Sequence, residues 1–477
     1  MNGRNGKMEL LGKTPIPKAL LAMGLPTMIG MMINALYNLV DAYFVGGLGS
    51  SQMGAISVVF PLGQAVVGLG LLFGNGAASY ISRLLGRGDR ETGGRAASTA
   101  LYSSLLAGAA LIIGTILFLS PVLKLLGATE SILPYAETYA GIYMVFSIFN
   151  VFNVTMNNLV TSEGAAKTTM LALLAGAMLN ILLDPVFIYL LDLGVAGAAI
   201  ATAISQIVSA SVYLCYILRK KSLFRFSVRE CCFSKEIFSE IFKIGVPTLV
   251  FQLLISLAVA LINMEAKEYG DSMIAAMGAV TRIISMGSLM VFGFIKGFQP
   301  IAGYSYGAGD YGRLKKAIKT AVLWSSLFCI AFGCIAALLS EPIISGFAAD
   351  DAEMVNFGQN ALRANGLSFM LFGFYTVYSS LFLALGKGRA GFILGALRQG
   401  ICFVPVILIL PGLWGANGIL YAQPAADVLS AGITVFMAVG LHKELVADKF
   451  AGCENMEEVH KAIEEVREMA KKEKPAE

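Results

Sequence analysis

Twelve long apolar segments dominate this chain of 477 residues. Each has roughly the 20 residues that a helix needs to cross the hydrocarbon core of a bilayer. The predicted spans are 20–45, 53–80, 96–120, 135–158, 169–191, 196–218, 242–264, 274–299, 317–340, 359–384, 391–411 and 415–441. Only 14% of the residues are charged, whereas a soluble domain carries about a quarter. The sequence therefore predicts an all-α polytopic membrane protein with twelve transmembrane helices.

The distribution of basic residues predicts how the chain is oriented in the membrane. Of the 35 Lys and Arg residues, 29 fall in the terminal segments and alternate loops, and only Lys124 and Lys267 fall in the loops on the other side. The remaining four lie within spans: Arg282, Lys296, Arg363 and Arg398. By the positive-inside rule we expect a multi-pass protein of the cell membrane, in contact with its lipids, with both termini in the cytoplasm. The net charge of +4 gives no reason to expect a nucleic-acid partner.

The chain contains one unit twice, offset by 221 residues. Gly24-Leu25-Pro26-Thr27 recurs as Gly245-Val246-Pro247-Thr248, and Gly86-Arg87-Gly88-Asp89 recurs as Gly307-Ala308-Gly309-Asp310. Six spans separate the copies, so the two halves have the same topology, as in transporters whose halves rock about a central site. We expect an N-terminal six-helix lobe (1–218), a cytoplasmic linker (219–241), a C-terminal six-helix lobe (242–445) and a cytoplasmic tail (446–477).

Two aspartates within predicted spans of the first half are the leading candidates for a functional site. An acid at the centre of a span costs roughly 2.5–3.5 kcal/mol, so it indicates function by default. Asp41 ends a polar stripe on one face of the first span, with Thr27, Gly30, Asn34 and Asn38 before it and Tyr37 beside it. The structural alternative is that Asp41 lies at a hydrated helix end.

Asp184 belongs to the segment Asn180-Ile181-Leu182-Leu183-Asp184-Pro185. Asn180 and Asp184 stand one turn apart on one helical face, and Pro185 cannot donate a hydrogen bond to the carbonyl of Ile181. A carboxylate, an amide oxygen and a released carbonyl suit a small hard cation such as Na⁺, and a buried carboxylate can instead hold a proton. The structural alternative is that Asp184 only caps a broken helix.

The fourth span carries a second polar stripe, and the sixth span adds Thr202 and Gln206. The stripe consists of Tyr139, Tyr143, Phe146, Asn150, Asn153 and Asn157. These side chains either join helices by hydrogen bonds or line a wet cavity, and we favour the cavity.

The second half does not repeat this chemistry. Ile262 stands where the repeat places Asp41, and the region matching Asn180 to Pro185 has a proline but no acid. Its ionisable candidates are Glu265, Lys296, Arg398 and Asp427. The sequence therefore predicts one acidic site, in the first half. It has no Walker-type loop and only two histidines, so we expect neither an enzyme nor a bound cofactor.

These features together resemble the multidrug and toxic compound extrusion (MATE) transporters. The resemblance rests on the two six-helix halves, on Asn34, Tyr37, Asn38 and Asp41 in the first span, and on Asn180-x-x-x-Asp184-Pro185 in the fifth, and it covers about residues 15–445. It implies an antiporter that expels organic, often cationic, amphipathic compounds in exchange for H⁺ or Na⁺.

The resemblance also implies roles for individual residues. The ion or proton site would consist of Asp41, Asn180, Asp184 and Thr202, which could ligate Na⁺, with Asn157 close to its network. The substrate cavity would be lined by Asn34, Tyr37, Asn153 and Asn157, to which we add Tyr139 from the fourth-span stripe. We expect hinges at Pro26 and Pro185, and a monomer.

Three other functions fit a polytopic chain. A flippase for a lipid-linked saccharide would need cationic residues for pyrophosphate, whereas the first half offers acids and amides. A membrane-embedded transferase would need His or Asp-x-x-x-Asp clusters, and a symmetric channel is not expected from two halves that differ around one acidic site. The sequence does not decide between H⁺ and Na⁺.

Overall fold

A computed structural model of the chain describes residues 4–48, 50–346 and 351–451, and within these ranges it is helical, without strands. The first half contains α1 (Arg4–Gly12), α2 (Ile16–Gly46), α3 (Ser50–Gly86), α4 (Arg90–Leu117), α5 (Leu119–Leu125), α6 (Leu133–Ser162), α7 (Ala166–Pro185), the π-helical η1 (Val186–Leu190) and α8 (Gly194–Leu218). The connection to the second half includes the short 3₁₀ helix η2 (Val228–Glu230). The second half contains α9 (Lys235–Lys267), α10 (Asp271–Gly307), α11 (Tyr311–Leu338), α12 (Ser340–Ser345), α13 (Ala352–Phe369), α14 (Phe372–Ala384), α15 (Gly388–Ala396), the π-helical η3 (Leu397–Ile401), α16 (Phe403–Trp414) and α17 (Ala416–Ala451).

The helical pattern confirms the predicted fold class. Eleven helices in the described ranges are long and apolar enough to cross a membrane, and the pair α13 and α14 makes the twelfth when it is counted as one span. The predicted span 359–384 is therefore bent rather than straight, since α13 and α14 meet at 51°. Of the predicted tail (446–477), α17 includes the part up to Ala451, and the rest lies outside the described residues.

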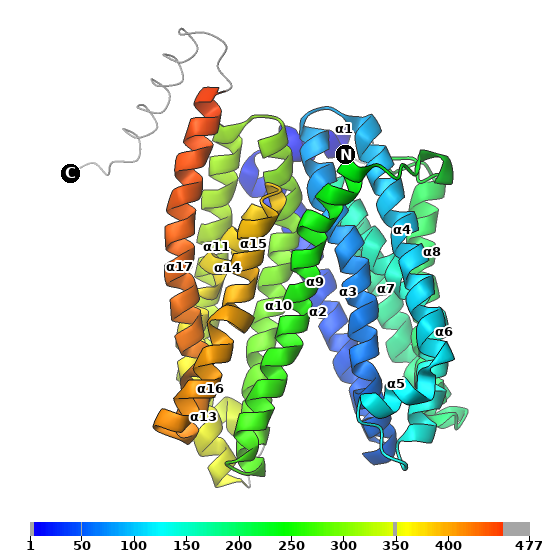
Figure 1. Cartoon of the computed structure of the whole chain (residues 1–477), viewed down its shortest axis with the longest axis vertical. Coiled ribbons are helices and arrows are strands. Elements are labelled where there is room, and N and C mark those ends of the chain that lie inside the picture. Colours follow the sequence, from blue (N-terminus) through cyan, green and yellow to red (C-terminus); the bar gives the residue numbers. More distant parts are fainter. Residues whose placement is uncertain (1–3, 49, 347–350, 452–477) are drawn as a thin grey trace, which may run out of the picture.

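The helices form two bundles that lie side by side, α2–α8 and α9–α17 (Figure 1). α1 and the last turns of α17 lie at the same end of the molecule, which we call the terminal end. The bundles approach each other there and diverge toward the opposite end (Figure 1). Their contact consists mainly of α2 against α10 and α3 against α9.

Glycines let the two bundles touch through their backbones. A Cβ atom on Gly297 of α10 would lie 2.6 Å from the Cα of Gly24 on α2, so only glycine fits there. Thr27, one residue after Pro26, donates a hydrogen bond of 2.6 Å from its hydroxyl to the carbonyl of Gly293. The expected hinge at Pro26 therefore lies within the contact between the bundles.

Charged and polar side chains add to this contact on α3. Arg83 pairs with Glu240 of α9, with 2.7 Å between Nη2 and Oε2. Nearer the middle of the helix, Asn75 donates a hydrogen bond of 2.9 Å to the hydroxyl of Thr248. The bundles are thus joined by specific contacts at and near the terminal end.

The short helix α1 bridges the two bundles at the terminal end. On the first-half side, Lys7 lies 3.8 Å from the carboxylate of Glu163 and donates to the carbonyl of Lys221 at 2.6 Å. On the second-half side, Arg313 of α11 donates to the carbonyls of Leu11, at 3.1 Å, and Thr14, at 2.7 Å.

Candidate site within the first bundle

Asn180 and Asp184 form the buried centre of the candidate site. Both lie on α7, and their side chains are 1% and 0% exposed. Asn180 donates a hydrogen bond of 3.1 Å from Nδ2 to Oδ1 of Asp184, as the one-turn spacing predicts. Pro185 follows at once and is succeeded by η1, a wider helical turn of a kind that occurs frequently at functional sites.

Three oxygens of this site lack hydrogen-bond partners among the described residues. They are Oδ2 of Asp184, Oδ1 of Asn180 and Oδ1 of Asp41. Buried oxygens of this kind normally have a partner, and each one without a partner requires an explanation. Carboxylate and amide oxygens are hard ligands, so these atoms fit a small cation such as Na⁺, and either carboxylate can also accept a proton.

Asp41 of α2 belongs to the same neighbourhood as Asp184. The two carboxyl groups lie near each other, and Tyr37 and Tyr139 lie near both of them. Tyr139 stacks on Tyr143 with 5.9 Å between the ring centroids. The structure thus brings the polar faces of α2, α6 and α7 together inside the first bundle. Of the predicted stripe on α2, the side chain of Asn38 lies outside the described residues.

The polar stripe of α6 serves partly to join helices. Asn153 donates from Nδ2 to the backbone carbonyl of Gln206, at 2.9 Å, and to its side-chain Oε1, at 2.7 Å. Its own Oδ1 has no hydrogen-bond partner among the described residues. Thr202, one turn before Gln206 on α8, is buried, whereas Asn34 on α2 is partly exposed.

Asn157 forms its hydrogen bonds with residues other than the acidic pair. Its Nδ2 donates to the hydroxyl of Tyr213 at 3.2 Å, and its Oδ1 accepts a hydrogen bond from Nζ of Lys296 on α10. The side chain therefore joins the first bundle to the second, and its hydrogen bonds do not reach Asp41 or Asp184.

In the second bundle the buried acid, Asp427, is paired with a buried arginine, Arg398. The sequence did not reveal this pairing. Asp427 of α17 accepts a hydrogen bond of 2.8 Å from Nε of Arg398, and further bonds of 2.8 Å from Ser368 and Gln423. The guanidinium also lies 4.6 Å from the ring centroid of Phe372. The only signal in the sequence was that Arg398 and Asp427 both lie within spans of the second half, among several other ionisable residues.

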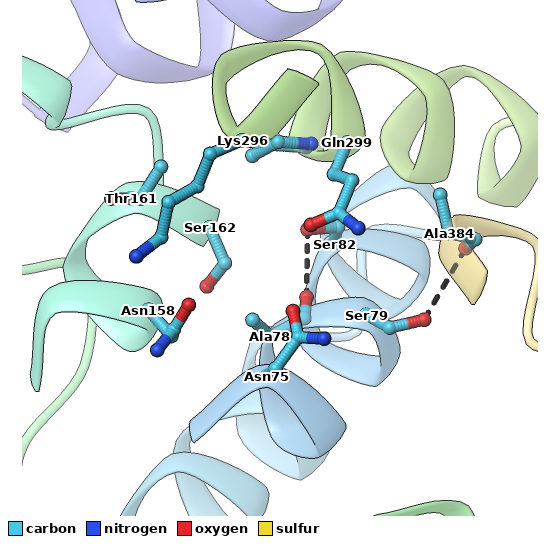
Figure 2. A pocket seen from close by; sticks show the side chains of 11 residues that line it. Asn75, Ala78, Ser79, Ser82, Asn158, Thr161, Ser162, Lys296, Gln299 and Ala384 are labelled. Atoms are coloured by element: carbon cyan, nitrogen blue, oxygen red, sulfur yellow. Dashed lines mark hydrogen bonds between the residues drawn. The ribbon is translucent and has the colours of Figure 1, made fainter. Parts of the chain in front are cut away.

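A cavity between the bundles is a second feature that sequence analysis missed. It has a volume of about 190 Å³. Its wall comes from helices of both bundles, mainly α3, α6, α9, α10, α14 and α15. A smaller, polar pocket adjoins it and shares Asn75, Asn158, Lys296 and Gln299 with it. Figure 2 shows the side chains of Lys296 and Gln299 of α10 extending toward the side chains of α3 and α6. The predicted substrate residues Asn34, Tyr37, Tyr139 and Asn153 line neither hollow, and Asn157 reaches this region through its bond to Lys296.

Comparison with known proteins relates this architecture to a family of exporters. The family model described as MatE matches twice, at residues 26–186 and 247–409, and the two matches begin 221 residues apart, as the internal repeat does. The multidrug export protein MepA of Staphylococcus saprophyticus is 30% identical over 438 residues, which is 92% of this chain and 96% of the relative. MepA of Staphylococcus aureus is 31% identical over 441 residues, which is 91% and 96% of the two chains.

Solved structures agree with this relationship. A multidrug resistance MATE transporter of the MOP superfamily in an outward-facing conformation has a TM-score of 0.87 and 27% identity, and the match covers 92% of this chain and 98% of the other. A MATE structure described as the bent conformation has a TM-score of 0.87 and 26% identity, with coverage of 93% and 99%. The repeated match to the family model, the relatives and these structures together show that the chain belongs to the MATE family of multidrug efflux transporters.

Proposed function

We propose that the protein is a cation-coupled antiporter, which exports organic compounds while H⁺ or Na⁺ enters through the first bundle. The observation that carries this proposal is that three oxygens, on Asp41, Asn180 and Asp184, have no hydrogen-bond partner within the described part of the chain. Two neighbouring carboxylates in a buried site repel each other when both are charged, so a bound cation or proton stabilises the site. Thr202 would complete the ion site, and the tyrosines and asparagines around it would provide its polar wall.

The arrangement of the bundles supports alternating access. They touch through the Gly24–Gly297 contact and the Arg83–Glu240 pair near the terminal end, and they diverge toward the other end (Figure 1). The basic loops predict that the terminal end is cytoplasmic, so the arrangement corresponds to a cavity closed toward the cytoplasm. Rocking of the bundles would then expose the cavity to each side in turn.

Ion binding and bundle movement would be linked through α2. Asp41 lies on the same helix as Pro26, and the segment around Pro26 packs against α10 of the second bundle. Neutralising the Asp41 and Asp184 charges removes their repulsion and favours a different position of α2, with Pro26 and Pro185 as the sites of bending. One charge that moves across 100 mV supplies about 2.3 kcal/mol. At about 1.4 kcal/mol per tenfold, this energy sustains a substrate gradient of roughly fifty-fold.

The test is gradient-driven efflux of ethidium, a fluorescent organic cation, from proteoliposomes. Pre-set pH and Na⁺ gradients are imposed separately on the unchanged protein and on Asp184→Asn. We expect efflux with one of the two gradients, which identifies the coupling ion, and no gradient-dependent efflux from the variant. Asp192→Asn is the matched control, because Asp192 is an exposed residue with φ of 53°, a conformation that asparagine tolerates. Equal gradient-driven efflux from the protein and from Asp184→Asn would remove Asp184 from the mechanism.

A further inference from the structure

Lys296 is a basic residue in the wall of the cavity between the two bundles. We propose that this cavity binds amphipathic organic anions, an aromatic or apolar body that carries a carboxylate or sulfonate, and that Lys296 pairs with the acidic group. The inference rests on the proposed export function and assigns to it a class of substrate. It adds acidic and zwitterionic compounds to the organic cations expected above.

The charge of the cavity wall supports an anionic ligand. Lys296 is the only charged side chain among the described residues that line the cavity and its polar extension. It forms no ion pair with the described residues, and the group that accepts its hydrogen bond, Oδ1 of Asn157, is neutral. A lysine within a membrane span is costly and usually has a counter-charge. An acidic ligand would supply the counter-charge that the wall lacks.

The other basic residues within spans differ from Lys296 in their surroundings. Arg398 is paired with Asp427, Arg363 donates to the hydroxyl of Ser340 at 2.9 Å, and Arg282 is exposed on the outside of α10. Lys296 alone among these four lines the cavity. Its charge is therefore not balanced by an acidic side chain among the described residues, although its Nζ also joins the bundles through Asn157.

The two ends of the cavity suit the two ends of such a molecule. The larger part is bordered by Phe251, Phe292 and Tyr375, which provide apolar surface for a ring system. The smaller part carries the amide groups of Asn75, Asn158 and Gln299, whose N–H groups can donate hydrogen bonds to acidic oxygens. The hydroxyls of Ser79, Ser82 and Ser162 already donate to backbone carbonyls and only add to the polarity of this part. Lys296 lies in both parts, where Figure 2 shows its side chain directed toward α6. A ligand with its ring in the larger part would place its acidic group near Nζ.

A purely structural lysine is the alternative. In that case Lys296 would only join the bundles through its hydrogen bond to Asn157, and its removal would weaken binding of all ligands equally or lower stability. A ligand-binding lysine instead discriminates by charge. The experiment must therefore compare ligands that differ in charge but have the same ring.

The probes are 1-naphthoate, 1-naphthalenemethanol and 1-naphthylmethylammonium, titrated into the purified full-length protein by calorimetry. We expect the protein to bind 1-naphthoate more tightly than the neutral alcohol. In Lys296→Gln the affinity for 1-naphthoate should fall roughly tenfold or more, because a charged hydrogen bond contributes about 1.5–3 kcal/mol, while the affinity for the alcohol stays within about twofold. Lys296→Arg should keep the preference for the anion.

The control is Arg282→Gln, which removes a positive charge from the same helix outside the cavity and should leave all three affinities unchanged. The thermal unfolding midpoint of each variant shows whether it is folded.

The inference is overturned if the protein does not prefer the anion, or if folded Lys296→Gln loses affinity for the acid and the alcohol alike. Ethidium efflux without an anion preference would overturn this inference and leave the antiporter in place. A Lys296-dependent preference for the anion without gradient-driven efflux would support this inference and overturn the antiporter.

Discussion

At the scale of single residues, the two halves treat buried acids in opposite ways. Asp427 pairs with Arg398 and accepts hydrogen bonds from Ser368 and Gln423. Asp184 accepts one hydrogen bond from an amide, and its other oxygen has no partner among the residues that the structure describes. An ion pair whose charges cancel stabilises the fold, whereas a buried carboxylate without a counter-charge can bind a cation. This contrast is the reason to place the coupling site in the first bundle.

The paired acid yields a stability prediction. Asp427→Leu leaves the Arg398 guanidinium buried without a counter-charge, and breaking such a pair costs about 3–5 kcal/mol. We expect a clear fall in the thermal unfolding midpoint of the purified protein. The double variant Arg398→Leu/Asp427→Leu removes both charges and should recover most of the loss. No recovery in the double variant would show that hydrogen bonding, not charge balance, governs this position.

Much of the acidic site could be predicted from the sequence, because its geometry is local. The four-residue spacing of Asn180 and Asp184 on one helix fixes their hydrogen bond. The place of Lys296 in the cavity wall could not be predicted, because it depends on how helices from both halves meet. The pairing of Arg398 with Asp427 was also hidden, since the two residues come from different helices and only tertiary packing decides whether they meet.

At the scale of elements, glycines let the backbones of α2 and α10 come into contact. The repeat and the helix lengths follow from the sequence, but the bend between α13 and α14 does not. Gly366 and Gly373 flank the break, but glycines such as Gly70 also lie inside unbroken helices, so they do not mark a bend. The closeness of α2 and α10 likewise depends on which of the many glycines faces a neighbour. Gly297 does so and Gly278, on the same helix, does not.

The glycine contact can be tested by adding one methyl group. Gly297→Ala places a Cβ 2.6 Å from the Cα of Gly24, so the helices must move apart. We expect a lower unfolding midpoint and slower efflux of ethidium. Gly278→Ala, where no atom lies within 4 Å of the new Cβ, should be neutral or slightly stabilising, since alanine is favoured over glycine in helices by about 1 kcal/mol. Equal effects of the two changes would contradict the packing described here.

A buried carboxylate in the connection between α6 and α7 predicts a dependence of stability on pH. Glu163 is fully buried, and it accepts hydrogen bonds from Tyr216, at 2.6 Å, Ser222, at 3.0 Å, and the backbone N–H of Leu223, at 2.5 Å. Burial raises the pKa of Glu163 above its ordinary value, despite these bonds and the nearby Lys7. The folded protein therefore holds this proton at a pH where the unfolded chain has lost it. The resulting stabilisation is complete below the unfolded pKa and is lost as the pH rises through the folded pKa.

The measurement is the unfolding midpoint of the protein and of Glu163→Gln from acidic to neutral pH. We expect the midpoint of the unchanged protein to fall relative to that of the variant over this range, because glutamine has no proton to lose. The matched control is Glu130→Gln, which removes an exposed carboxylate and should keep the pH profile of the unchanged protein. Parallel profiles for the protein and Glu163→Gln would contradict the raised pKa.

At the scale of the whole molecule, two homologous bundles carry different chemistry around one cavity. The first has the acidic site, the second has a neutralised acid, and Lys296 reaches from the second bundle to Asn157 of the first. If the bundles rock as proposed, the duplication supplies the symmetry that this movement needs. In the proposed antiport, the divergence of the two halves lets one bundle bind the ion while both enclose the substrate.

The central claim is that export of substrate and entry of a cation are one coupled process through Asp41 and Asp184. The most direct test is the reverse experiment, in which an outward gradient of ethidium alone is imposed on proteoliposomes without any ion gradient. Entry of H⁺ is followed with a trapped pH dye and entry of Na⁺ with a radioactive tracer. The account predicts that ethidium efflux drives one of these ions inward in the unchanged protein, and that Asp184→Asn abolishes this ion entry. Ethidium efflux without movement of either ion would contradict it.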